Sequence, residues 1–137
     1  MSSVLKYEYR LDRLINYVNS LKIYCEKDNY FKEFEDIIKY LEYSKEDILL
    51  LLQDLKGTKD INLNNIELYN FLKSIKNNYI LSDKSINKIL YINKYCNKLK
   101  KNKNKKNLYK EFSKIVEYFD DVLDEINDYM NNYNFWN

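Results

Sequence analysis

Closely spaced carboxylates near the C-terminus are the residues of this sequence best suited to hydrolytic or metal chemistry. Their helical spacing would place them near one face, a geometry that could hold a divalent ion. They are Asp121, Asp124, Glu125 and Asp128. The chain contains no histidine, which is the commonest general base and a usual ligand in di-metal helical bundles. We therefore interpret this row as the solvated side of an amphipathic helix, and we expect no catalytic residue, no bound metal and no cofactor.

Lysines form a second dense group immediately before these acids. Such a run could attract phosphate or an acidic partner. Its members are Lys98, Lys100, Lys101, Lys103, Lys105, Lys106 and Lys110. Positions 98–108 contain no aromatic residue that could stack on a base, and the formal net charge of the whole chain is only +2. We interpret residues 100–107 as a solvated loop and expect no nucleic-acid partner.

Two further rows contain residue types that bind other proteins. The first helical segment carries arginines and tyrosines, which dominate interface hot spots, beside its apolar seam. This stripe consists of Arg10, Arg13, Tyr17 and Tyr24. A second row at seven-residue steps widens the apolar face of the last segment: Tyr109, Val116, Leu123 and Met130. The first row could form an interface or simply the rim of a core in a chain with 15 tyrosines. The second could serve a homodimer or the core.

Composition narrows the function classes and the compartment. The chain has no Pro or Ala and a single glycine, Gly57, which excludes glycine-rich phosphate loops and dinucleotide-binding fingerprints. The longest apolar run, Ile48–Leu52, is far shorter than a membrane span. The first residues show no secretory signal and the last show no membrane anchor. Two cysteines, Cys25 and Cys96, are too few and too far apart for a disulfide framework or a zinc site. We expect a protein of a reducing cytoplasm.

Apolar residues recur every three to four positions in every long segment, which predicts an all-α domain spanning residues 1–137. The expected helices cover roughly 4–26, 28–42, 44–56, 64–77, 82–99 and 107–131. Ser44 would start the third helix, and Gly57 would end it in a left-handed conformation. Asn64 and Glu67 match a capping box, and Ser82 would cap the next helix. A long coiled coil is the alternative, because the first and last segments carry clean heptads.

The order of these segments resembles the poxvirus Bcl-2-like proteins, small helical virulence factors. The aromatic-rich LDRLINYVNSLKIY is followed by KEFEDIIKYLEYSKEDILLLLQDLKG, which is similar to the family's paired second and third helices. IELYNFLKSI then leads to SDKSINKILYINKYC, in the place of the family's central helix. The C-terminal EFSKIVEYFDDVLDEINDYM resembles the family's last helix. The resemblance implies a Bcl-2-like bundle of six to seven helices with a central helix near 82–99.

The resemblance also implies a function without catalysis in the host cytoplasm. Such a protein would sequester a host signalling protein and inhibit NF-κB activation, with a homodimer possible. The alternative on the same fold is an anti-apoptotic protein whose surface groove binds pro-death helices. A second alternative is an unrelated small helical interaction protein of an AT-rich microbe or phage. A structure without a central helix wrapped by the others would favour this last hypothesis.

Overall fold

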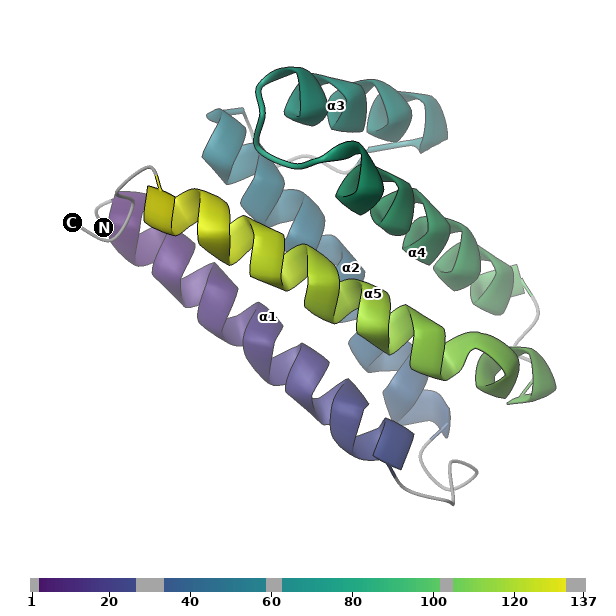
Figure 1. The fold of residues 1–137 in the computed structure, drawn as a ribbon. Helices are drawn as coiled ribbons and strands as arrows, with labels where there is room; N and C mark the ends of the chain where they lie inside the picture. Colours follow the sequence, from purple (N-terminus) through teal and green to yellow (C-terminus); the bar gives the residue numbers. More distant parts are fainter. Residues whose placement is uncertain (1–2, 27–33, 59–62, 102–104, 133–137) are drawn as a thin grey trace.

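Five α-helices make up the computed structural model, which describes residues 3–26, 34–58, 63–101 and 105–132, and no strand occurs among these residues. The helices are α1 (Ser3–Glu26), α2 (Phe34–Lys56), α3 (Asn65–Asn77), α4 (Asp83–Lys101) and α5 (Lys105–Asn132). The predicted all-α class is confirmed. The four long helices α1, α2, α4 and α5 form a closed ring, in which each helix runs antiparallel to its two neighbours (Figure 1). The short helix α3 packs on α4 at one end of this bundle.

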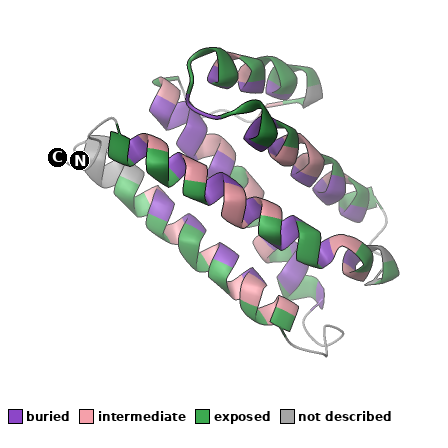
Figure 2. Ribbon diagram, viewed as in Figure 1, coloured by how far each residue is buried: buried purple, intermediate pink, exposed green. Residues whose placement is uncertain are grey.

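Each long helix turns one apolar stripe into the middle of the ring (Figure 2). Because these stripes face a common interior, one continuous hydrophobic core forms between the four helices. Its largest fully buried side chains include Leu14, Leu21, Ile37, Leu51, Ile89, Phe112 and Phe119. Burial of each such side chain stabilises the fold by about 1.5–3 kcal/mol relative to an exposed one.

The prediction of two separate helices over 28–42 and 44–56 is wrong for the part that the structure describes. A single helix, α2, runs through both segments, and residues 28–33 lie outside the described residues. Ser44 is completely buried within α2 and starts no helix. It occupies the same stripe as Leu41, Ile48 and Leu51, at three- to four-residue steps. The serine is therefore a small core residue in an uninterrupted seam, and the expected count of six to seven helices is not confirmed.

The expectation of a central helix near 82–99 is also not confirmed. Helix α4 packs on α5, α2 and α3, whereas α1 lies on the far side of the ring (Figure 1). Only one face of α4 is buried; Asn87 and Lys94 on its other face are exposed, and Lys88 is half-buried. A helix enclosed on all sides would need apolar residues around its whole circumference. The polar residues of α4 therefore favour the outer position that the structure gives it.

Apart from the break expected at Ser44 and the start near 28, which lies outside the described residues, the predicted helix ends lie within two residues of the observed ones. The backbone N–H of Glu67 donates to Asn64 Oδ1 over 2.8 Å, and the Glu67 side chain accepts from the backbone N–H of Asn64, which completes the capping box. Gly57 ends α2 with φ of 81°. The Ser82 hydroxyl accepts a hydrogen bond from the backbone N–H of Ser85 at the start of α4. The lysine-rich segment is more helical than expected, because α4 continues to Lys101 and α5 begins at Lys105.

The turn between α3 and α4 contains an unusual backbone conformation. Tyr79 has φ of 59°, a left-handed conformation that most side chains disfavour. Its backbone N–H donates to the carbonyl of Lys76, and the N–H of Ile80 donates to the carbonyl of Ile75. These bonds close the end of α3 in a Schellman-type turn, where glycine is the usual residue. The Tyr79 ring points into solvent, with 84% of the residue exposed.

Candidate interaction surface

Both arginines of the chain bind aspartates across the α1–α2 packing. Arg13 makes a bidentate contact with Asp47, with Nε donating to Oδ2 over 2.8 Å and Nη2 donating to Oδ1 over 2.5 Å. Arg10 Nη1 donates to Asp54 Oδ2 over 2.5 Å and to the carbonyl of Leu50 over 3.3 Å. Both aspartates are buried, and the hydrogen bond to Asp47 raises the pKa of Arg13. The side chains of both arginines therefore stabilise the packing of α1 against α2.

Tyrosines from α1 and α2 meet beside these ion pairs at the molecular surface. The Tyr17 ring lies 5.4 Å from that of Tyr43 and 5.8 Å from that of Tyr40. The Tyr24 ring lies 6.0 Å from Tyr40, and the Arg13 guanidinium lies 5.5 Å from the ring of Tyr9. We call this group the α1–α2 aromatic seam, and it consists of Tyr9, Arg13, Tyr17, Tyr24, Tyr40 and Tyr43. Tilted rings at these separations attract each other beyond the effect of burial alone.

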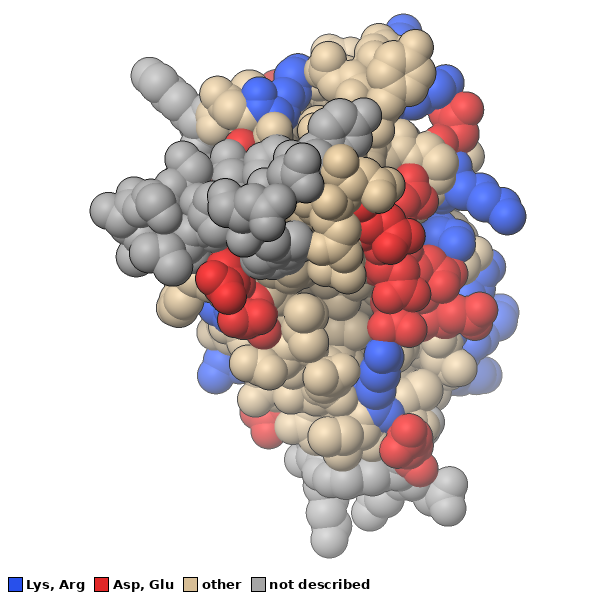
Figure 3. Space-filling model, turned by 60° about the vertical axis from the view of Figure 1, so that its left-hand side comes forward, with Lys and Arg blue, Asp and Glu red and all other residues tan. Residues whose placement is uncertain are grey.

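Part of this seam is open to solvent. Tyr9 is 61% exposed and Tyr43 is 37% exposed, whereas Tyr17, Tyr24 and Tyr40 are half-buried. Among the described residues, the other large apolar side chains exposed on α1 are Ile15 and Ile23. On the face that Figure 3 shows, uncharged side chains form a broad area beside a patch of acidic ones. The structure thus brings Tyr17 and Tyr24 of the predicted stripe together with Arg13, while Arg10 turns toward Asp54.

The second predicted row has a different environment. Val116 and Leu123 are buried at 6% and 7% exposure, Met130 is fully buried, and all three belong to the core cluster. Tyr109 is half-buried and packs against the same cluster, and burial raises the pKa of its hydroxyl. The broad apolar face of α5 is needed because α5 contacts both α1 and α4. Of the two earlier interpretations of this row, the structure favours the core over a homodimer surface.

The acidic residues of α5 hold neighbouring helices. Glu125 accepts hydrogen bonds from the backbone N–H and hydroxyl of Ser82 and from the hydroxyl of Ser85, so it neutralises the N-terminal end of α4. Asp121 pairs with Lys88 over 2.8 Å, and Asp120 pairs with Lys22 of α1 over 2.6 Å. In the described part of the chain, no three His, Cys, Asp or Glu side chains converge as metal ligands would.

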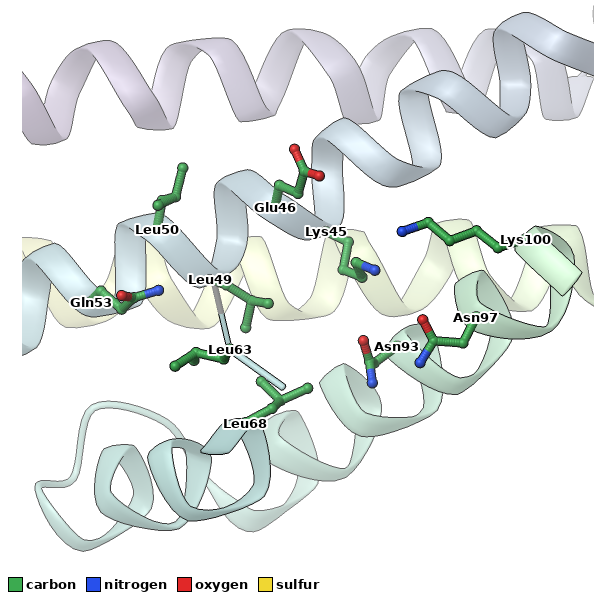
Figure 4. A pocket seen from close by; sticks show the side chains of 10 residues that line it. All are labelled: Lys45, Glu46, Leu49, Leu50, Gln53, Leu63, Leu68, Asn93, Asn97 and Lys100. Carbon is green, nitrogen blue, oxygen red and sulfur yellow. The ribbon is translucent and has the colours of Figure 1, made fainter. Parts of the chain in front are cut away.

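A groove lies between α2 and α4 and is also lined by Leu63 and by Leu68 of α3. Its volume is about 330 Å³, and Figure 4 shows lysine and asparagine side chains at one end and leucines at the other. The lining residues are Lys45, Glu46, Leu49, Leu50, Gln53, Leu63, Leu68, Asn93, Asn97 and Lys100. Glu42 bridges Lys45 and Lys100 near the polar end. Six of these ten lining residues are polar, so the groove lacks the continuous apolar floor that an amphipathic helix requires.

The two cysteines have different surroundings. Cys96 is buried, and this burial raises the pKa of its thiol to about 12. Cys25 is half-buried against the core. A buried, protonated thiol is a poor nucleophile and behaves as a small apolar side chain. Cys96 thus fits the structural role that its place on an apolar stripe suggests.

The residue pattern did not identify three members of the seam, Tyr9, Tyr40 and Tyr43, or the two buried aspartates that pair with the arginines, Asp47 and Asp54. The two aspartates lie seven residues apart in a leucine-rich segment, and this spacing is the signal that could have identified them. An acid on the buried side of a helix requires a cationic partner, and the chain has only two arginines. Arg10 and Arg13 are three residues apart, whereas the aspartates are seven residues apart, so spacing alone does not assign each arginine to its partner.

No protein-family model, curated protein or solved structure matches this chain. None of the helices in the described ranges has the length and apolar character needed to span a bilayer.

Proposed function

We propose that this protein is a small helical interaction module that binds a partner protein through the α1–α2 aromatic seam and acts by stoichiometric sequestration, without catalysis. The observation that carries the proposal is the α1–α2 aromatic seam, in which Arg13 lies over the ring of Tyr9 and the other tyrosine rings contact one another. Tyr and Arg are the residue types enriched in interface hot spots. The Arg13–Asp47 contact and the ring contacts hold them in place, so little side-chain entropy is lost when a partner binds.

The narrower proposal, a viral inhibitor of NF-κB signalling in the host cytoplasm, is supported by the resemblance of helix order and of the C-terminal helix. The ring of four long helices favours the broader function, because α4 is not wrapped by the others. The anti-apoptotic alternative depends on an apolar groove for a pro-death helix. The groove between α2 and α4 is mostly polar, so it gives this alternative little support.

A matched pair of surface variants tests the interaction function. Tyr9→Ser/Tyr43→Ser removes exposed rings from the aromatic seam, whereas Tyr69→Ser/Tyr79→Ser removes exposed rings from α3 and the following turn. Quantitative affinity capture with each variant should identify proteins that the wild type and the control retain and the seam variant loses. Calorimetry with the purified partner should then give a fixed stoichiometry. Equal retention by the seam variant, or loss with both variants, would contradict the proposal.

An NF-κB reporter assay tests the narrower proposal with the same three proteins. Suppression by the wild type and the control, with loss for the seam variant, is the expected result. If a partner binds the seam but the reporter is unaffected, the interaction function stands and the signalling role is rejected.

A further inference from the structure

Charge is strongly segregated along the second half of the chain. Residues 84–110 contain ten lysines and no acid, whereas residues 111–128 contain seven acids and one lysine. The net charge of +2 averages over these two opposed segments. The expectation of no nucleic-acid partner rested partly on that average, which hides the local field of each segment.

The α4–α5 hairpin places the lysines of two helices on one face. We call it the lysine face, and its members are Lys94, Lys98, Lys101, Lys106, Lys110 and Lys114. All six side chains are exposed. Lys114 lies 4.4 Å from the ring centroid of Tyr91, a residue that lines a hollow with Lys94 and Lys98, so the two helices contribute to a single surface. Neighbouring lysines on both helices raise the local positive potential.

Two shallow hollows shape this face. The first, of about 190 Å³, is lined by Tyr91, Lys94, Tyr95, Lys98 and Glu111. The second, of about 410 Å³, is lined by Asn93, Lys94, Asn97, Lys98 and Lys101. Lys94 and Lys98 belong to both, and Glu111 is the only acid among the lining residues. Lysine ammonium and asparagine amide groups both donate hydrogen bonds to phosphate oxygens.

We propose that the lysine face binds the sugar-phosphate backbone of a nucleic-acid duplex without reading its bases. The positions of the exposed apolar side chains among the described residues favour a nucleic acid over a protein as the ligand of this face. They lie on α1, α2, α3 and the turn after α3, and none is on α4 or α5. A protein interface needs a desolvated apolar centre, whereas a phosphate backbone needs only cations and hydrogen-bond donors.

A phosphate-backbone ligand also requires no aromatic ring, and no aromatic residue is exposed in the described parts of α4 and α5. Tyr91 donates a hydrogen bond to Glu111 and packs edge-on against Tyr118, with ring centroids 5.6 Å apart, so it is not positioned to stack on a base. Single-strand binding relies on such stacking, but duplex binding does not. The α5 lysines from Lys106 to Lys114 extend along about 12 Å of helix, and together with the three α4 lysines they offer six cations to the phosphates of a duplex.

Fluorescence anisotropy with a labelled DNA duplex of about 20 base pairs tests this proposal. With six lysines engaged, the logarithm of the association constant should fall against the logarithm of the salt concentration with a slope of about −5 between about 50 and 200 mM salt. Lys94→Gln/Lys98→Gln should weaken binding severalfold and reduce the steepness of the slope by about 2. The matched control Lys39→Gln/Lys73→Gln changes the total charge equally at exposed sites on α2 and α3, and should bind like the wild type.

Each other outcome overturns the proposal in a defined way. Absence of duplex binding at about 50 mM salt rejects the nucleic-acid ligand. Equal weakening by the control variant rejects the lysine face as its location. Tighter binding to a single strand of the same length, or a strong sequence preference, rejects backbone recognition of a duplex. Binding only to vesicles containing phosphatidylserine, or only to an acidic peptide, assigns the face to another class of ligand.

Discussion

Replacing Arg13 with methionine is expected to destabilise the protein by about 2 kcal/mol. Breaking a fully buried ion pair costs about 3–5 kcal/mol, because the remaining charge is left without a partner, whereas an exposed pair contributes at most about 1 kcal/mol. The Arg13 and Asp47 side chains are 35% and 6% exposed, so this pair lies between those limits. For a chain of this size, the melting temperature should fall by roughly 8 °C.

Three variants separate the charge effect from lost packing. Asp47→Leu/Arg13→Met removes both charges and should be more stable than Arg13→Met alone, because no carboxylate then stays buried without a counter-ion. Lys22→Met is the control, because it breaks the ion pair with Asp120. The side chains of Lys22 and Asp120 are 40% and 41% exposed, so this change should lower the free energy of unfolding by no more than about 1 kcal/mol. Urea unfolding followed by circular dichroism measures all three. The reasoning is refuted if Arg13→Met costs no more than Lys22→Met, or if the double variant is the least stable.

Three further predictions concern single positions. Tyr79→Gly should raise the melting temperature by a few degrees, since glycine relieves about 1 kcal/mol of left-handed strain at an exposed site; no rise would show that the turn is unstrained. Glu125→Ala should lower the free energy of unfolding by about 1–2 kcal/mol, because the N-terminal end of α4 loses its carboxylate partner. Hydrogen exchange of the backbone amides in the first turn of α4 should become faster, and unchanged exchange would contradict this role of Glu125. Cys96 should resist a thiol reagent at pH 8 until the chain unfolds, while Cys25 reacts. Burial raises the pKa of the Cys96 thiol, so its contribution to the free energy of unfolding should be intact below about pH 8.5 and should decline as the pH rises toward 12. The free energy of unfolding of the wild type should therefore fall more steeply over this pH range than that of Cys96→Val.

The fold class and most helix ends could be predicted because they depend on local chemistry. Apolar periodicity gives the all-α class, and the Asn64–Glu67 box and Gly57 act within one helical turn of their own backbone. Ser44 shows the limit of this reasoning. A serine before acidic residues has the pattern of a helix start, and only the packing of α2 against its neighbours makes it a core residue.

The α1–α2 aromatic seam was harder to predict because its pairs join distant segments. Tyr17 and Tyr24 were correctly placed together on one helix, but their partners lie on α2, beyond the reach of a periodicity argument. Arg10 was grouped with them by spacing, although the buried charge of Asp54 draws it away. The arrangement of whole helices has the same difficulty. Residues 82–99 have an apolar stripe that is compatible with a helix inside a bundle and with one at its edge. The position of this helix depends on which other helices pack against it.

The polar cross-links also have a consequence for how the chain folds. Most of those seen among the described residues join helices within the α1–α2 hairpin or within the α4–α5 hairpin, such as Arg13 with Asp47 and Lys88 with Asp121. Lys22–Asp120 and Glu42–Lys100 are ion pairs between the two hairpins. Contacts between elements adjacent in the chain require little loop closure, and helical proteins built from them fold in microseconds to milliseconds. We expect each hairpin to form as a cooperative unit, with docking of the two as the later event. The α1–α5 and α2–α4 junctions, where the two hairpins meet, are then expected to close last and to open first.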